Sequence, residues 1–337
     1  MTKDNKIRFR QQKLLVTLLI AVCVFLGGCI GKKPKVHRVG IVSGVEAFAN
    51  IVDGFKAKMT ELGYIEGENI VYDFQRLNAD RAGEERVAKK FVADKVDLIF
   101  AFPTEPAMAA KQATQGTNIP VVFAISTIEG TNLVEKVHLP GGNITGVRFP
   151  GPESTVKRLE ILHELVPQAK RVYLIYDRNY PAIPIALEGL RPASSSLGIT
   201  LVEDTINNLE DLKSAIEKRA ASGDIGIDAI LIMPDILTHS ADGFATILEF
   251  ANKHKVPIGG CMGFMADLGA LFSFFPDNIG TSKLAAGLVD NIFKGTQAGT
   301  IMVITPKCHL RLNCKAIQEL GLTVSEGLLN RADEIIR

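Results

Sequence analysis

The feature that most restricts how this chain can fold is an α/β pattern that occurs twice in the same order. Short β-branched runs alternate with amphipathic segments, and four landmarks of the first half return 131 to 137 residues later. The landmark pairs are His37-Arg38-Val39 with Lys170-Arg171-Val172, Leu62-Gly63 with Leu197-Gly198, Asp97-Leu98-Ile99 with Asp228-Ala229-Ile230, and Ile119-Pro120-Val121 with Val256-Pro257-Ile258. A period of this length indicates a duplicated domain rather than a solenoid of short repeats.

The alternation itself predicts the fold class. Continuous apolar runs separated by helices are typical of parallel strands covered on both faces, so we expect an α/β protein with two doubly wound parallel-sheet lobes. In the first lobe, strands are predicted at 39–42, 70–74, 98–100 and 121–123, and helices at 49–62, 84–92 and 107–113. Beyond the second copy, the pattern predicts strands at 270–275, 301–304 and 309–312, and helices at 277–293 and 325–336.

The predicted lobes are discontinuous in sequence. We expect the first lobe to comprise residues 36–146 and 275–300, and the second to comprise 147–274 and 301–337. Three crossover strands would join the lobes around a hinge. Ligands of doubly wound sheets bind beyond the carboxyl ends of the strands, so the pattern predicts a cleft between the lobes that hinge closure can seal. We expect the chain to act as a monomer.

The N-terminus has the features of an export signal. The first 28 residues carry five basic side chains and one acidic one, and residues 14–26 are uncharged. Thirteen residues are too few for a membrane-spanning helix, which needs about 20, but they suit a signal peptide over residues 1–28. Leu26-Gly27-Gly28-Cys29 resembles the bacterial lipobox, which implies that Cys29 is acylated. We therefore expect an exported protein in the cell envelope, held to a membrane by lipid through a tether at 29–35.

The rest of the chain shows no motif for covalent chemistry. The formal net charge is +1, but the first 28 residues account for +4, which leaves −3 and no basic block for nucleic acid. The sequence has no P-loop, no G-x-S-x-G elbow and no H-E-x-x-H motif, so we expect no cofactor, no metal and no catalytic residue. The six histidines are scattered and are interpreted as surface or locally satisfied residues.

Several turn and packing motifs point to one family. They are Glu61-Leu62-Gly63-Tyr64-Ile65-Glu66-Gly67 with Asn69, Asp97-Leu98-Ile99-Phe100, Pro140-Gly141-Gly142-Asn143-Ile144-Thr145-Gly146, Leu320-Gly321-Leu322-Thr323 and Arg331-Ala332-Asp333-Glu334-Ile335-Ile336. In this order the chain resembles the substrate-binding lipoproteins of bacterial ABC transporters with a type I periplasmic-binding fold, in the group that includes tryptophan- and tyrosine-binding members. The resemblance implies capture of a small molecule, an amino acid or similar, and its delivery to an ABC permease with a separate ATPase.

The cleft residues of that family are only partly present. The family has a Thr-Pro-Ala-like turn where this chain has 103–107, which implies that the Thr104 hydroxyl and the following helix amides bind a carboxylate, unless Thr104 is a plain N-cap. Thr127 lies in the segment where the family usually has an acidic residue, and 259–263 also lacks a charge. These departures leave an α-ammonium group without its usual carboxylate partner.

Further candidates follow the predicted strands. Asp177 or Asp235 could replace the missing carboxylate, although a turn or a helix cap is the simpler role for either. Tyr180 and Phe48 could stack on a ring of the ligand or simply pack. The candidate ligand-binding residues are Ser43, Glu46, Phe48, Thr104, Thr127, Asp177, Asn179, Tyr180 and Asp235.

Two alternatives to transport remain open from the sequence. The same two-lobed module could report a ligand to a membrane sensor or receptor. The scaffold could also carry an enzyme, which would need an acid, a base or a nucleophile converging in the cleft. An anionic ligand would pair with Arg148 and Arg178, which are otherwise solvated loop charges.

Overall fold

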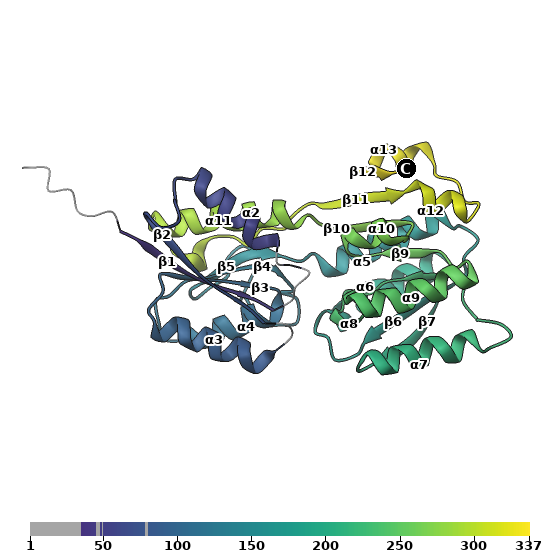
Figure 1. The fold of residues 1–337 in the computed structure, drawn as a ribbon, viewed down its shortest axis with the longest axis horizontal. Helices are drawn as coiled ribbons and strands as arrows, with labels where there is room; N and C mark the ends of the chain where they lie inside the picture. Colours follow the sequence, from purple (N-terminus) through teal and green to yellow (C-terminus); the bar gives the residue numbers. More distant parts are fainter. Residues whose placement is uncertain (1–34, 45–47, 49, 78–79) are drawn as a thin grey trace, which may run out of the picture.

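The structure, a computed structural model, describes residues 35–337 apart from 45–47, 49 and 78–79. Two α/β lobes lie side by side (Figure 1), which confirms the predicted fold class. The predicted signal peptide, the lipidation site Cys29 and all but the last residue of the tether lie outside the described residues. Within the described part, no helix is both long enough and apolar enough to cross a membrane.

The first lobe is built on a five-stranded parallel sheet with the order β2-β1-β3-β4-β5. Its strands are β1 (His37–Ser43), β2 (Ile70–Arg76), β3 (Leu98–Phe102), β4 (Val121–Ser126) and β5 (Ile144–Arg148), and its helices are α2 (Asn50–Glu61), α3 (Arg81–Ala93), α4 (Thr104–Ala113) and α11 (Asn278–Phe293). Along β3 the side chains alternate, so that Phe100 packs with α2 and α11 whereas Ile99 and Ala101 pack with α3 and α4. The two helix pairs cover opposite faces (Figure 1).

Helix α11 reaches the first lobe from a distant part of the sequence. Its Ala285 and Ala286 are fully buried, which allows a close approach to α2. At its end, the ring of Phe293 stacks on His37 with 3.9 Å between ring centroids, and the Tyr64 hydroxyl donates a hydrogen bond to Asp290 Oδ1 at 3.1 Å. Without α11, one face of the first sheet would be only half covered.

The second lobe contains a seven-stranded sheet with the order β12-β11-β10-β9-β8-β6-β7, in which only β10 and β11 run antiparallel. Its strands are β6 (Arg171–Asp177), β7 (Thr200–Ile206), β8 (Ala229–Leu231), β9 (Ile258–Gly260), β10 (Phe272–Pro276), β11 (Cys308–Asn313) and β12 (Glu334–Ile336). The helices are α5 (Gly151–Leu165), α6 (Ala182–Ser196), α7 (Leu209–Ala220), α8 (Ile236–His239), α9 (Ala241–His254), α10 (Gly263–Leu268), α12 (Cys314–Glu319) and α13 (Glu326–Arg331). A 3₁₀ turn, η2 (Ala298–Thr300), follows α11 and contacts β5 of the first lobe.

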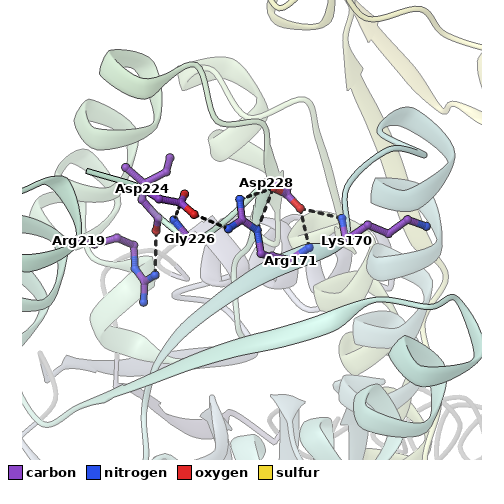
Figure 2. Close-up of polar contacts among 7 residues, drawn as sticks. Lys170, Arg171, Arg219, Asp224, Gly226 and Asp228 are labelled. Atoms are coloured by element: carbon purple, nitrogen blue, oxygen red, sulfur yellow. Dashed lines mark hydrogen bonds and ion pairs between the residues drawn. The ribbon is translucent and has the colours of Figure 1, made fainter. Parts of the chain in front are cut away.

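An aspartate at the amino end of each sheet makes the same contact, as the duplicated pattern predicts. In the first lobe, Asp97 Oδ2 accepts a hydrogen bond from the Arg38 amide at 2.8 Å. In the second lobe, Asp228 Oδ2 accepts bonds from the amides of Lys170 and Arg171 at 2.9 and 2.8 Å, and its Oδ1 pairs with the Arg171 guanidinium (Figure 2). Each aspartate amide also donates to its arginine's carbonyl oxygen at 2.8 Å.

The chain crosses between the lobes at three described places: between β5 and α5, between β10 and α11, and between η2 and β11. The third crossing was predicted as a strand at 301–304, which is wrong in extent. Only Ile304 forms a bridge, to Val147, with its amide donating to Gly146 and its carbonyl oxygen accepting from Arg148, both at 2.9 Å. Pro306 follows closely and has no amide hydrogen with which to extend the pairing.

The C-terminal segment also differs from the single helix predicted at 325–336. The helix α13 ends at Arg331, and the segment then turns to form β12 beside β11. The Asp333 carboxylate secures this turn, because it accepts the Leu310 amide at 3.0 Å and pairs with Lys307 at 2.5 Å. The pairing of β12 with β11 thus prevails over the helical spacing of the apolar residues in this segment.

We expect Asp228→Asn to lower the free energy of unfolding by about 1–2 kcal/mol, because a charged acceptor of two backbone amides and a guanidinium becomes a neutral one. Asp224→Asn is the matched control, since Asp224 pairs with the same Arg171 but its side chain is 72% exposed. Denaturant unfolding followed by circular dichroism measures both variants. If Asp224→Asn lowers the free energy of unfolding as much as Asp228→Asn does, the role given to Asp228 is wrong.

Candidate ligand-binding site

A pocket lies between the lobes, where the carboxyl ends of strands from both sheets meet. We call it the inner pocket. Its walls come from Phe48 after β1, from the loops after β3 and β4, from two of the crossings, and from the loops after β6, β8 and β9. It is lined by Phe48, Pro103, Thr104, Ile125, Thr127, Phe149, Tyr180, Ala182, Pro234, Asp235, Ile236, His239, Met262 and Phe275. Five of the predicted candidates, Phe48, Thr104, Thr127, Tyr180 and Asp235, therefore come together here.

Three phenylalanines form an apolar wall of the inner pocket. Phe149 and Phe275 lie on two different crossings and stack with 5.3 Å between ring centroids, and Phe48 stacks on the other side of Phe275 at 6.3 Å. All three are buried, so their rings are held in place before any ligand arrives. Such a surface suits an aromatic or other flat apolar group.

Asp235 is the one carboxyl group among the lining residues of the inner pocket. It is 1% exposed and caps α8, because its carboxylate accepts hydrogen bonds from the Thr238 amide at 2.9 Å and the Thr238 hydroxyl at 2.8 Å. No described basic side chain forms an ion pair with it. Burial raises the pKa of Asp235 to about 7, although the hydrogen bonds from Thr238 oppose the shift. A cation brought beside it would restore the charged form.

Thr104 begins α4, but its hydroxyl does not cap the helix. The N-cap position belongs to Pro103, and Thr104 Oγ1 instead accepts a hydrogen bond from the Thr127 amide at 3.0 Å. The plain N-cap alternative for Thr104 is therefore wrong. Its hydroxyl proton has no acceptor among the described residues, so a ligand oxygen can accept it beside the first amides of α4.

The other candidates lie away from the inner pocket. Asp177 and Asn179 form the turn after β6, where Asp177 Oδ1 accepts the Asn179 amide at 2.9 Å. Ser43 is buried at the end of β1, and its carbonyl oxygen accepts from the Leu77 amide at 2.8 Å. Glu46 lies outside the described residues.

Both candidate arginines already have protein partners. Arg148 forms ion pairs with Glu129 and Glu153, and its Nε donates to Thr305 at 2.8 Å, so it links the first and third crossings. Arg178 donates a hydrogen bond to Thr205. Neither residue lines the inner pocket.

His239 lines the inner pocket and was not predicted. Its Nε2 is buried and has no hydrogen-bond partner within the described part of the chain. Burial lowers the pKa of His239 to about 3, so the ring is neutral. The signal that could have revealed it is its spacing, because His239 stands four residues after Asp235 and one helical turn brings the two side chains to the same side. No cluster of three or more His, Cys, Asp or Glu that could hold a metal occurs among the described residues.

Two duplicated lobes with a pocket at the carboxyl ends of their strands define a two-lobed solute-binding protein. A model of the family described as ABC transporter substrate binding protein matches residues 35–336, and the chain belongs to this family. The resemblance seen in the sequence is thereby confirmed. Proteins of this family bind substrates outside the cytoplasm and are not enzymes.

Three similar proteins illustrate the relationship. The tyrosine-binding protein of Clostridioides difficile is 30% identical over 277 residues, covering 81% of this chain and 77% of that protein. A conserved domain protein from Vibrio cholerae O1 biovar El Tor has a TM-score of 0.80 at 27% identity, covering 89% of this chain and all of the other. An ABC domain from Streptococcus pneumoniae in complex with L-Trp has the same fold, with a TM-score of 0.80 at 24% identity over 90% of this chain and all of the other.

The buried Asp235 makes stability depend on pH in a defined direction. Because its folded-state pKa of about 7 lies above the unfolded value of 3.8, its contribution is fully present at low pH and is lost as the pH rises towards 7. We expect the stability of the wild type to fall by a few kcal/mol relative to Asp235→Asn between about pH 4 and pH 8, at about 1.4 kcal/mol per pKa unit.

Urea unfolding across this pH range, without ligand, measures the difference between the two proteins. Asp242→Asn is the control, because Asp242 is an exposed acidic residue in the first turn of α9, and its difference from the wild type should stay nearly constant. If the difference for Asp235→Asn is equally constant, Asp235 does not have the raised pKa.

Proposed function

We propose that this protein is a lipid-anchored receptor that captures a small molecule with an aromatic ring and an ammonium group and delivers it to an ABC permease. The observation that carries the ligand class is Asp235, a buried carboxyl without a cationic partner among the described residues, in a pocket walled by aromatic rings. Such a carboxyl group lacks the cation that an ammonium group supplies. Aromatic amino acids belong to this class, as do the tyrosine and L-Trp named for two of the similar proteins.

Capture would follow from the position of the pocket between two movable bodies. Thr104 belongs to the first lobe and Asp235 to the second, so a ligand that contacts both binds more strongly when the lobes are close together. Burial of an aromatic ring against Phe149 and Phe275 supplies about 1.5–3 kcal/mol. No covalent step is needed, and closure itself would give the permease a surface that differs from that of the empty protein.

The anchor and the partners rest on the sequence. The lipobox-like segment at 26–29 follows a charged and then an apolar stretch, and acyl chains on Cys29 would hold the protein at a membrane without spanning it. The chain has no P-loop, so the energy for transport would come from the ATPase of the permease complex.

Calorimetric titration of the chain from Cys29 onward with L-phenylalanine, L-tyrosine and L-tryptophan tests the proposed ligand class. We expect Asp235→Asn to weaken binding about 10- to 100-fold, because a charge-assisted hydrogen bond to the ammonium group is lost. Asp242→Asn should bind as the wild type does, since this exposed residue does not line the pocket.

The variant Asp177→Asn distinguishes between Asp177 and Asp235, the two residues that the sequence offered as the carboxylate partner of the ammonium group. A loss in Asp177→Asn without a loss in Asp235→Asn would place the ammonium group at the turn after β6 and contradict the role given to Asp235. If no ligand with a ring and an ammonium group binds to the wild type, the proposed ligand class is wrong.

A further inference from the structure

A second cavity adjoins the inner pocket and has a different chemical character. This outer chamber has a volume of about 200 Å³ and shares Pro103, Tyr180 and Ile236 with the inner pocket. Its first-lobe wall carries Glu84, Glu105 and Arg81, and its second-lobe wall carries Asp177 and Asn179. A ligand in the inner pocket therefore has the outer chamber as its immediate neighbour.

Glu84 is an acidic residue of low exposure that faces this chamber, and its carboxyl group forms no ion pair with another described residue. The residue is only 3% exposed, and no described residue donates a hydrogen bond to its carboxyl group. The carboxyl group lies close to the backbone at Gly44, where an added Cβ would be 2.8 Å from Glu84 Oε1 and 2.7 Å from Pro106 Cγ. Burial, together with the charge of nearby Glu105, raises the pKa of Glu84 to about 7. Burial raises the pKa of Glu105 as well.

The helix dipole alone does not explain why Glu84 and Glu105 face the outer chamber. Glu84 and Glu105 lie in the first turns of α3 and α4, where a negative charge is favourable. An exposed carboxylate in the first turn would gain the same interaction without desolvation. Burial and the charge of Glu105 raise the pKa of Glu84, so its position in the fold disfavours the charged form. A group that remains buried and unpaired at this cost indicates a partner that arrives with the ligand.

The charges around the cleft do not balance among the described residues. Glu84, Glu105 and Asp177 face the outer chamber, and Asp235 faces the inner pocket. The basic side chain that lines the outer chamber is that of Arg81. It is 72% exposed, and its Nη2 lies 3.9 Å from Glu105 Oε1. No lysine or arginine is among the described residues that line the inner pocket. The inner pocket and the outer chamber thus offer several acidic partners for a cation and one basic side chain, Arg81, for an anion. Lys111 lines a further cavity, together with Arg81, Glu84 and Glu105.

We propose that the outer chamber makes this site selective for an aromatic amine, which is a net cation, over the corresponding amino acid, whose carboxylate would lie close to Glu84 and Glu105. The inference rests on the proposed function and narrows its ligand class. Tyr180 separates the ring site from the acidic chamber and remains a neutral donor, because burial and then the charges of Glu105 and Asp235 raise its pKa.

Calorimetric titration of the chain from Cys29 onward with matched probes tests the selectivity. The titrations are made at about pH 8, above the pKa of about 7 of Glu84, so that this carboxyl group is ionised. The probes are phenethylamine, L-phenylalaninol and L-phenylalanine, and tyramine with L-tyrosine as a second pair. The alcohol replaces the carboxylate by a neutral group and keeps an ammonium group that is still charged at this pH. We expect the amine and the alcohol to bind at least about tenfold more tightly than the amino acid, the size of one charge-assisted contact.

The double variant Glu84→Gln, Glu105→Gln should bring the affinities for amine and amino acid to within about threefold of each other, because the repulsion of the carboxylate is removed. The single variant Glu84→Gln should show a preference for the amine that is intermediate between those of the wild type and the double variant. Glu160→Gln is the control, since Glu160 on α5 is exposed, pairs with Lys157 and lines neither cavity. Its selectivity should equal that of the wild type. Each variant removes a charge and keeps the shape, and circular dichroism checks that it folds.

The outcomes separate this inference from the proposed function. An amino acid that binds as tightly as its amine, or more tightly, overturns the selectivity while leaving the proposed function in place. A preference for the amine that survives in the double variant also overturns it, because the acidic pair would then not be the cause. If none of the probes binds, both the proposed ligand class and the selectivity are wrong.

Discussion

The packing of α11 on the first lobe is the contact on which the rest of the molecule depends. This helix follows five of the seven strands of the second lobe in the sequence, yet it is one of the two helices that cover one face of the first sheet. Because the chain has to travel to α11 and back, it crosses between the lobes three times within the described residues. Two of those crossings place Phe149 and Phe275 between the lobes, so the aromatic wall of the pocket is a direct result of this path.

The cleft combines this apolar wall with two carboxyl groups, those of Asp235 and Glu84, that form no ion pair with a described residue. Asp235 is held by α8 and Glu84 by α3, so both are fixed by helix starts on opposite lobes. Each loses hydration and has a raised pKa, which is a cost to the empty protein. The guanidinium of Arg148, which could have served an anion, is instead engaged by Glu129 and Glu153 beside the crossings. The electrostatic character of the cleft therefore fits the positive group that we propose it binds.

The architecture and part of the candidate site could be predicted from the sequence because they depend on local patterns. Apolar runs mark where strands end, and parallel strands end at the same edge of a sheet. On this basis Thr104 and Asp235 were predicted to line one cleft, and both line the inner pocket. The pairing of Ile304 with Val147 could not be predicted, since it depends on where two distant crossings meet. The same holds for the outer chamber, because its walls come from Glu84 and Glu105 in one lobe and from Asp177 in the other, and the sequence does not show that these segments face each other.

The interleaved course of the chain also determines when each lobe can be completed. The first sheet ends at residue 148, but α11 ends at Phe293, so ribosomal synthesis at about 5–20 residues per second leaves one face of that sheet partly bare for roughly seven to thirty seconds. The second sheet in turn waits for β11 and β12 at the C-terminal end of the chain. Neither lobe can therefore finish folding before the other is largely made, and a molecule with two lobes is completed as one folding unit.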